Sequence, residues 1–129
     1  MSSSPEQKLR ALVVDDDDTV IDFLTQVLHR MNFTVEHAFD GLDALRRCQS
    51  ASYDIVICDV RMPRLSGLSL LSNLSQTLNA ETRVVMVSAL DDDSLRRQAM
   101  ASGATHYLIK PLTAETLCAA IGDAGSVRN

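Results

Sequence analysis

Apolar and polar residues follow two different patterns along the chain, and the two patterns alternate five times. Short runs rich in Val, Ile and Leu predict strands at 11–14, 33–39, 54–58, 83–87 and 105–109. These runs do not alternate strictly between apolar and polar residues. That pattern is typical of strands that are buried on both faces, as in a parallel sheet.

The segments between these runs carry apolar residues at helical spacing. This spacing predicts helices near 20–31, 41–50, 68–78 and 117–124. A further helix is expected around 92–102, where only Leu95, Ala99 and Met100 are available to pack inward. We therefore expect this helix to be thinly packed and, as a consequence, mobile.

The alternation predicts a single α/β domain with an open, doubly wound sheet. Five strand–helix units in 129 residues, joined by right-handed crossovers, place helices on both faces of the sheet. We expect a flexible N-terminal segment at 1–8, the domain itself at 9–124, and a tail or the start of a linker at 125–129.

Composition and charge narrow the classes of partner. With 46% hydrophobic and 22% charged residues, the chain has the composition of a globular domain. Its net charge of −5 and its lack of a basic stripe argue against binding of nucleic acid by the domain itself. No apolar run reaches membrane-spanning length and no signal-peptide core follows the start, so we expect a cytoplasmic protein without membrane contacts.

Cys48, Cys58 and Cys118 lack metal-type spacing and are expected to be core residues.

Polar residues that can carry chemistry stand at the ends of the predicted strands. Asp15 and Asp16 follow the first strand, Asp59 the third, Ser88 the fourth and Lys110 the fifth. The carboxyl ends of parallel strands form the edge at which open α/β sheets bind ligands. In a sheet ordered 2-1-3-4-5 the first and third strands are neighbours, so the three aspartates would converge, with the serine and the lysine beside them.

Three converging carboxylates need a counter-charge, and their chemistry indicates which one. Mg²⁺ prefers oxygen ligands and often binds one or two carboxylates together with phosphate oxygens. An aspartate beside such a cation can act as a nucleophile toward a phosphoryl group and form an acyl phosphate. A lysine and a hydroxyl can stabilise the charge on the phosphoryl oxygens. The set therefore predicts phosphoryl transfer.

The other acidic residues have simpler interpretations. Asp17 and Asp18 precede the first predicted helix, and Asp91 to Asp93 precede the fourth. Carboxylates at such positions accept hydrogen bonds from free amides and suit the helix dipole, so we expect caps there. Taken alone, Lys110 could be a surface lysine and Ser88 the start of a loop.

Four segments in order resemble the response-regulator receiver domains of two-component signalling. They are the acidic pair in VVDDDD, the segment DIVICDVRMPRLSG, the hydroxyl residue in VVMVSAL, and GATHYLIKP. Each segment is loosely defined alone, but the combination is specific, and the resemblance covers about Leu9 to Ala124. It implies a flavodoxin-like (βα)5 fold with a parallel five-stranded sheet of order 2-1-3-4-5.

The resemblance also implies roles for the acidic residues. Asp59 matches the phosphoacceptor. Mg²⁺, for which Mn²⁺ could substitute, would be bound by Asp16, Asp59 and the backbone carbonyl of Arg61, with Asp15 assisting through a water molecule. The domain would catalyse its own phosphorylation and dephosphorylation without being an enzyme in the ordinary sense.

Residues of the last two strands complete the implied site. Ser88 would contact the phosphoryl group after its arrival, and Lys110 would pair with it. Tyr107 matches the switch aromatic, which turns inward as the hydroxyl residue moves. The Lys110–Pro111 peptide is expected to be cis, a form that costs little only before proline.

The chain departs from the family pattern at a few positions. It has Ser66–Gly67 where Asp-Gly is common, and Leu112 where an aromatic residue is common. Arg61 and Leu90 occupy two variable positions that influence how long the phosphoryl group survives. We expect the long cationic side chain at 61 to affect this lifetime, without predicting the direction.

The implied partners are proteins. A histidine kinase or a histidine phosphotransfer protein would donate the phosphoryl group, and phosphorylation would switch the surface of the helix around 92–102, the strand 105–109 and the last helix. That surface would control an output domain or target, which the sequence does not identify, and could form a homodimer. The chain could be a stand-alone regulator or the N-terminal piece of a longer protein.

Two alternatives compete with this interpretation. Asp15, Asp17, Thr19 and Val20 fit the pattern D-x-D-x-T-V of haloacid-dehalogenase-type phosphatases, in which the first aspartate is the nucleophile. The absence of a cap and the short chain argue against such an enzyme. The other alternative is a pseudo-receiver that binds proteins without being phosphorylated, against which the complete set of site residues argues.

Overall fold

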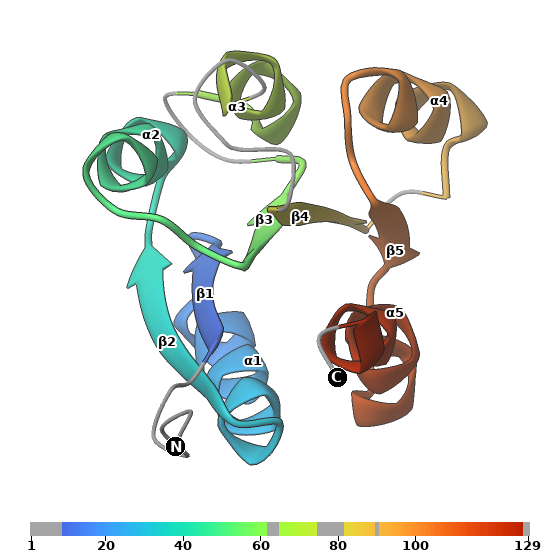
Figure 1. The fold of residues 1–129 in the computed structure, drawn as a ribbon. Helices are drawn as coiled ribbons and strands as arrows, with labels where there is room; N and C mark the ends of the chain where they lie inside the picture. The colour runs from blue at the N-terminus through green and yellow to red at the C-terminus, as the bar shows by residue number, and fades with distance from the viewer. Residues whose placement is uncertain (1–8, 62–64, 75–81, 90, 128–129) are drawn as a thin grey trace.

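A five-stranded parallel sheet lies between two layers of helices (Figure 1). The computed structural model describes residues 9–61, 65–74, 82–89 and 91–127. The segment expected to be flexible at 1–8, the variable position Leu90 and the last two residues lie outside this part of the chain.

The strands have the predicted order and direction. They are β1 (Leu9–Val14), β2 (Phe33–Ala38), β3 (Ile55–Asp59), β4 (Arg83–Ser88) and β5 (His106–Ile109). All neighbours pair in parallel, in the order β2-β1-β3-β4-β5. This confirms the expected doubly wound sheet and places β1 and β3 side by side at its centre.

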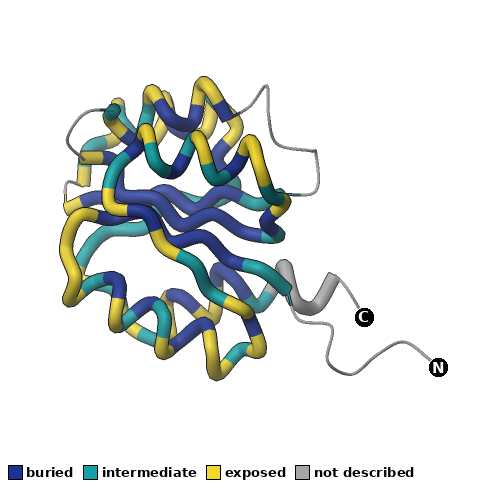
Figure 2. Tube along the Cα trace, turned by 90° about the vertical axis from the view of Figure 1, so that its left-hand side faces the viewer, coloured by how far each residue is buried: buried dark blue, intermediate teal, exposed yellow. Residues whose placement is uncertain are grey.

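The expectation that all strands are buried on both faces is wrong for the two edge strands. β3 is buried throughout, and β1 and β4 are buried apart from their first residues. β2 has two buried, two intermediate and two exposed residues, and β5 is intermediate throughout. An edge strand has a neighbour on one side only and lies where the helical layers thin out. Figure 2 shows the sheet as the most buried part of the fold, between helices whose outer faces are exposed.

Helices cover the sheet on both sides. They are α1 (Asp18–Arg30), α2 (Gly41–Ser50), α3 (Gly67–Leu74), α4 (Asp93–Ala101) and α5 (Ala114–Val127). α1 and α5 lie on one face, and α2, α3 and α4 on the other (Figure 1). The boundary expected at residue 124 falls inside α5, and the extent of the domain stays a prediction. Within the described chain, no helix combines the length and the apolar character needed to cross a membrane.

Alternate residues of each strand feed two hydrophobic cores. On β3, Val56 and Cys58 pack toward α2, α3 and α4, while Ile55 and Ile57 pack toward α1 and α5.

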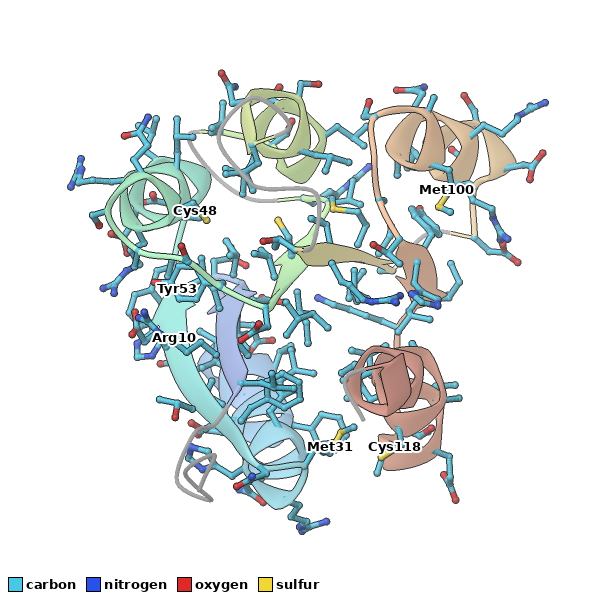
Figure 3. All side chains as sticks on the ribbon, viewed as in Figure 1. Arg10, Met31, Cys48, Tyr53, Met100 and Cys118 are labelled. Carbon is cyan, nitrogen blue, oxygen red and sulfur yellow. The ribbon has the colours of Figure 1, made fainter. Side chains whose placement is uncertain are left out.

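The fourth helix, α4, is thinly packed as expected, because Ala99 is its one buried residue. Met100, expected to point inward, instead has 45% of its surface exposed (Figure 3). The mobility of α4 stays a prediction.

The cysteines divide into two environments. Cys48 and Cys58 are buried as expected, and burial raises the pKa of the Cys48 thiol to about 11. The expectation for Cys118 is wrong, because this residue is exposed on α5, with its Sγ atom 3.9 Å from the Sδ atom of Met31, the C-cap residue of α1 (Figure 3). The inward positions of α5 are Leu117 and Ile121, so Cys118 lies off the buried stripe.

A polar network ties β1, β2 and α2 together away from the carboxyl ends of the strands. Glu36 accepts hydrogen bonds from Arg10 Nη2 at 2.6 Å and from the hydroxyl of Tyr53 at 2.7 Å. Arg47 Nη1 approaches the same carboxylate at 3.7 Å, and the guanidinium of Arg10 lies 5.1 Å from the ring centroid of Tyr53 (Figure 3). Tyr53 is 3% exposed, so its hydroxyl depends on Glu36 for a partner.

Replacing Tyr53 with phenylalanine is expected to lower the free energy of unfolding by about 1–2 kcal/mol at neutral pH, since a hydrogen bond to a charged acceptor is lost. Burial, followed by the bond to Glu36, raises the pKa of Tyr53 from 10.0 to about 12. The stability linked to the neutral phenol is therefore complete below pH 10 and is lost as pH rises toward 12. Denaturant unfolding of both proteins at several pH values should show their difference shrinking above pH 10. A constant difference would contradict this account.

Candidate functional site

The ends of four strands bring the predicted polar residues together. Asp15 directly follows β1, Asp59 ends β3, Ser88 ends β4, and Lys110 directly follows β5. Asp15, Asp59 and Ser88 are 2%, 8% and 1% exposed, and within the described residues they are the buried side chains of polar or charged type. Carboxylate oxygens of Asp15, Asp16 and Asp59 all lie within 4.8 Å of one another. Burying polar and charged side chains lowers the stability of the folded protein. Their gathering at one edge of the sheet therefore indicates a functional site.

Lys110 joins the two buried carboxylates. Its Nζ atom lies 3.0 Å from Asp59 Oδ2 and 3.3 Å from Asp15 Oδ2. Burial alone would lower the pKa of Lys110, but the hydrogen bond to Asp59 and the charges of both carboxylates outweigh burial and raise it. The lysine therefore remains a cation aimed at the phosphoacceptor candidate.

One lysine does not balance the negative charge of the cluster. Burial raises the pKa of Asp15, the amide of Asp17 opposes this shift by donating to Asp15 Oδ1 at 2.9 Å, and the charge of Asp59 raises the pKa further. The net direction is upward despite the neighbouring Lys110. A second positive charge would thus be favoured among these carboxylates.

The cluster fits a small divalent cation. Its donors are hard carboxylate oxygens of Asp15, Asp16 and Asp59, two of them buried and one exposed to solvent. Mg²⁺ accepts such donors and keeps several waters, for which the exposed side near Asp16 leaves room. Arg61, whose backbone carbonyl is a further candidate ligand, follows closely after Asp59, and its amide donates to Asp59 Oδ1 at 3.1 Å. The Arg61 side chain is exposed.

Of the remaining aspartates of the run VVDDDDTV, one caps the first helix and the other, also expected to be a cap, is the first residue of that helix. Asp17 is the N-cap of α1 and accepts a hydrogen bond from the amide of Thr19 at 2.9 Å, while Asp18 opens the first turn. Asp92 caps α4 in the same manner. Because the Asp17 carboxylate is exposed and engaged in capping, its geometry argues against the acid–base role that a haloacid-dehalogenase-type phosphatase would require.

Two glycines hold the loops around the site in place. A Cβ atom on Gly67 would overlap the carbonyl oxygen of Asp59 and lie 2.8 Å from Val60 Cα, and the Gly67 amide donates to Val60 O at 2.8 Å. A Cβ atom on Gly41 would lie 2.5 Å from Leu65 O. The sequence shows only that Ser66–Gly67 stands where Asp-Gly is common in the family. No local signal shows that this glycine lies against the backbone of Asp59.

The ends of β4 and β5 are joined beside the site. The backbone amide of Lys110 donates to the carbonyl of Ser88 at 2.8 Å, and the Lys110–Pro111 peptide is cis. Tyr107 lies half-buried on β5 and packs against the core beneath α4. Ser88, the hydroxyl residue, and Tyr107, the aromatic residue, therefore lie on neighbouring strands.

An apolar cleft of about 390 Å³ adjoins the lysine, and sequence reasoning missed it. It lies between the start of α1 and the loop after β5, and is lined by Thr19, Val20, Phe23, Lys110, Pro111 and Leu112. Its two walls come from opposite ends of the chain, so no local pattern could reveal it.

Comparison with known proteins places the chain in a family. The family model for the response regulator receiver domain matches residues 11–122. The response regulator MprA of Mycobacterium ulcerans is 39% identical over 86% of this chain, which covers 47% of that protein. The curated relatives are longer, and the chain spans less than half of their length.

Solved structures of related proteins have the same fold. A response regulator from Burkholderia pseudomallei, determined with a phosphorylated aspartic acid, a calcium ion and citrate, aligns with a TM-score of 0.81 and 26% identity over 93% of this chain and 71% of that chain. The CheX–CheY–BeF3–Mg complex of Borrelia burgdorferi aligns with a TM-score of 0.85 and 28% identity over 91% and 89%. The sheet order, the converging carboxylates and the match over residues 11–122 agree, and this chain belongs to the response regulator receiver family of regulatory domains.

Proposed function

We propose that this domain accepts a phosphoryl group on Asp59 from a phosphohistidine of a histidine kinase or histidine phosphotransfer protein. The observation that carries the proposal is the geometry of Asp59, a nearly buried carboxylate held 3.0 Å from the Lys110 ammonium and clustered with Asp15 and Asp16. A phosphorylated aspartic acid in the Burkholderia pseudomallei relative supports the same chemistry here.

The transfer requires little covalent chemistry from the protein. A carboxylate oxygen of Asp59 attacks phosphorus, the P–N bond to the donor imidazole breaks, and its electron pair remains on the ring nitrogen. Lys110 lies where it can stabilise the negative charge of the phosphoryl oxygens, and the Ser88 hydroxyl can donate a hydrogen bond to one of them. Positioning and electrostatics then supply most of the rate.

The metal in this proposal is Mg²⁺, for which Mn²⁺ could substitute. Asp16, Asp59 and the backbone carbonyl of Arg61 would hold it, and Asp15 would assist through water. When bound, the cation supplies positive charge that offsets the carboxylates and the incoming phosphoryl group. The Mg²⁺ of the Borrelia burgdorferi complex supports this choice of ion.

The phosphorylated domain would act through a surface change. Ser88 would move toward the phosphoryl group, Tyr107 would turn inward, and the surface of α4, β5 and α5 would change shape. This surface would control an output domain or target, or form a homodimer. With a net charge of −5, the domain would act on protein partners in the cytoplasm and not bind nucleic acid itself.

Removing divalent cations tests the metal-dependent part of the proposal. With phosphoramidate as a small phosphodonor, chelation of Mg²⁺ is expected to slow acyl-phosphate formation by about a hundredfold or more, because several kcal/mol of charge stabilisation are lost. Intact-mass spectrometry of the protein over time measures the rate, and added Mn²⁺ should restore it. Equal rates with and without chelator would contradict the proposal. If the protein did not respond to beryllofluoride in the presence of Mg²⁺, the pseudo-receiver alternative would be favoured instead.

A further inference from the structure

We propose that Arg96 of α4 is a positioning residue that holds the ring of Tyr107 in its half-buried position and thereby sets how readily the domain switches. The inference rests on the proposed function, in which Tyr107 is the switch aromatic. It concerns a contact between α4 and β5 that the proposed function does not itself include.

The guanidinium of Arg96 is fixed from two sides. Its Cζ atom lies 5.6 Å from the ring centroid of Tyr107, within the range of a cation–π contact. Its Nη2 atom lies 3.4 Å from Asp91 Oδ1. The Arg96 side chain is 44% exposed and that of Asp91 is 80% exposed, so both contacts are partly screened and modest in strength.

A modest contact matters at this place because α4 has few other attachments. Ala99 is the one buried residue of the helix, and Leu95 is only partly buried against the same core as Tyr107. Met100 is largely exposed. The contact of Arg96 with Tyr107 therefore adds to a small set of contacts that hold α4 against the rest of the domain.

The contact also lies on the path from the site to the surface. Ser88 ends β4, Asp91 stands in the loop that follows it, and Tyr107 pairs with Met86 on β4. Movement of Ser88 can thus reach the contact of Arg96 with Tyr107 through the paired strands β4 and β5. Inward rotation of the ring would take it away from the guanidinium, so the contact opposes switching.

Two matched variants separate this role from a general loss of charge. Arg96→Gln removes the stacking, whereas Arg97→Gln removes the same charge one position later. Arg97 is 76% exposed and pairs with Asp93 of the same helix at 3.6 Å. Arg96→Lys keeps a cation that can still approach the ring, so it should restore part of the effect.

The chain has two tyrosines, which makes the ring of Tyr107 easy to observe. Labelling with 3-fluorotyrosine gives one fluorine resonance for Tyr107 and one for Tyr53, which lies in the distant Glu36 network and serves as an internal reference. We expect Arg96→Gln to shift the Tyr107 resonance of the free protein and to tighten beryllofluoride binding in Mg²⁺ about two- to fivefold. Arg97→Gln should do neither.

Three results would overturn the inference. They are an unchanged Tyr107 resonance in Arg96→Gln, an unchanged beryllofluoride affinity in that variant, and equal effects of Arg96→Gln and Arg97→Gln. Failure of the proposed function is recognised separately, because the wild-type protein would then show no response to beryllofluoride at all. The fluorine spectrum of the free protein tests the Arg96 contact independently of that response.

Discussion

Replacing Asp59 with asparagine is expected to abolish formation of the acyl phosphate. Asparagine keeps the size of the side chain but lacks the anionic oxygen that attacks phosphorus. Asp59 and Asp15 are both buried and bonded to Lys110, but Asp59 has the shorter contact, 3.0 Å against 3.3 Å, and it ends the central strand β3. Intact-mass spectrometry after incubation with phosphoramidate and Mg²⁺ should show no added phosphoryl group. The far-ultraviolet circular dichroism of the variant should match that of the wild-type protein.

Two further variants serve as controls for the loss of phosphorylation in Asp59→Asn. Asp18→Asn changes an exposed residue in the first turn of α1 and should be phosphorylated like the wild-type protein. Asp15→Asn should slow phosphorylation, because it weakens the charge balance around Lys110, without removing the nucleophile. Loss of label in Asp15→Asn together with full label in Asp59→Asn would favour the haloacid-dehalogenase-type alternative.

Replacing Gly67 with alanine is expected to lower the free energy of unfolding by about 3 kcal/mol and to slow phosphorylation. The added methyl group would overlap the carbonyl oxygen of Asp59 and crowd Val60 Cα. Both neighbours are backbone atoms of the strand end and cannot move aside by changing a rotamer. Relief of the overlap therefore requires a shift of the loop or of Asp59 itself, which misaligns the site.

Gly122 offers a matched control for this substitution. It lies in α5, and apart from its chain neighbours and the adjoining backbone of the helix, no atom lies within 4 Å of the position that a Cβ atom would take. Alanine there should raise the free energy of unfolding by about 0.5–1 kcal/mol, since it favours the helix. Urea unfolding measures both variants. Equal stability of Gly67→Ala and the wild-type protein would show that the close approach of the loop to Asp59 carries no strain.

The sequence predicted the architecture well because the signals for it are local and repeated. The alternation of β-rich runs and helical spacing determines a doubly wound sheet, and the sheet then places Asp15, Asp59, Ser88 and Lys110 at one edge. The caps at Asp17 and Asp92 were likewise predictable, because a carboxylate just before a helix has a simple physical role.

The features that were missed depend on contacts between distant segments. Cys118 is exposed because it lies off the stripe of α5 that faces the sheet. The apolar residues around it in the sequence had predicted a core position. The cleft beside Lys110 has walls from α1 and from the loop after β5. Likewise, the stacking of Arg96 on Tyr107 joins a helix to a strand through side-chain directions that periodicity does not encode.

Locating the phosphoryl group along the chain shows directly whether Asp59 carries it. The protein would be phosphorylated with phosphoramidate in Mg²⁺ and treated with borohydride, which reduces an aspartyl phosphate to homoserine. Peptide mass spectrometry would then identify the altered residue. We expect homoserine at position 59 and unaltered aspartate at positions 15 and 16. Homoserine at position 15, or at no aspartate in a protein that has gained the phosphoryl mass, would contradict it.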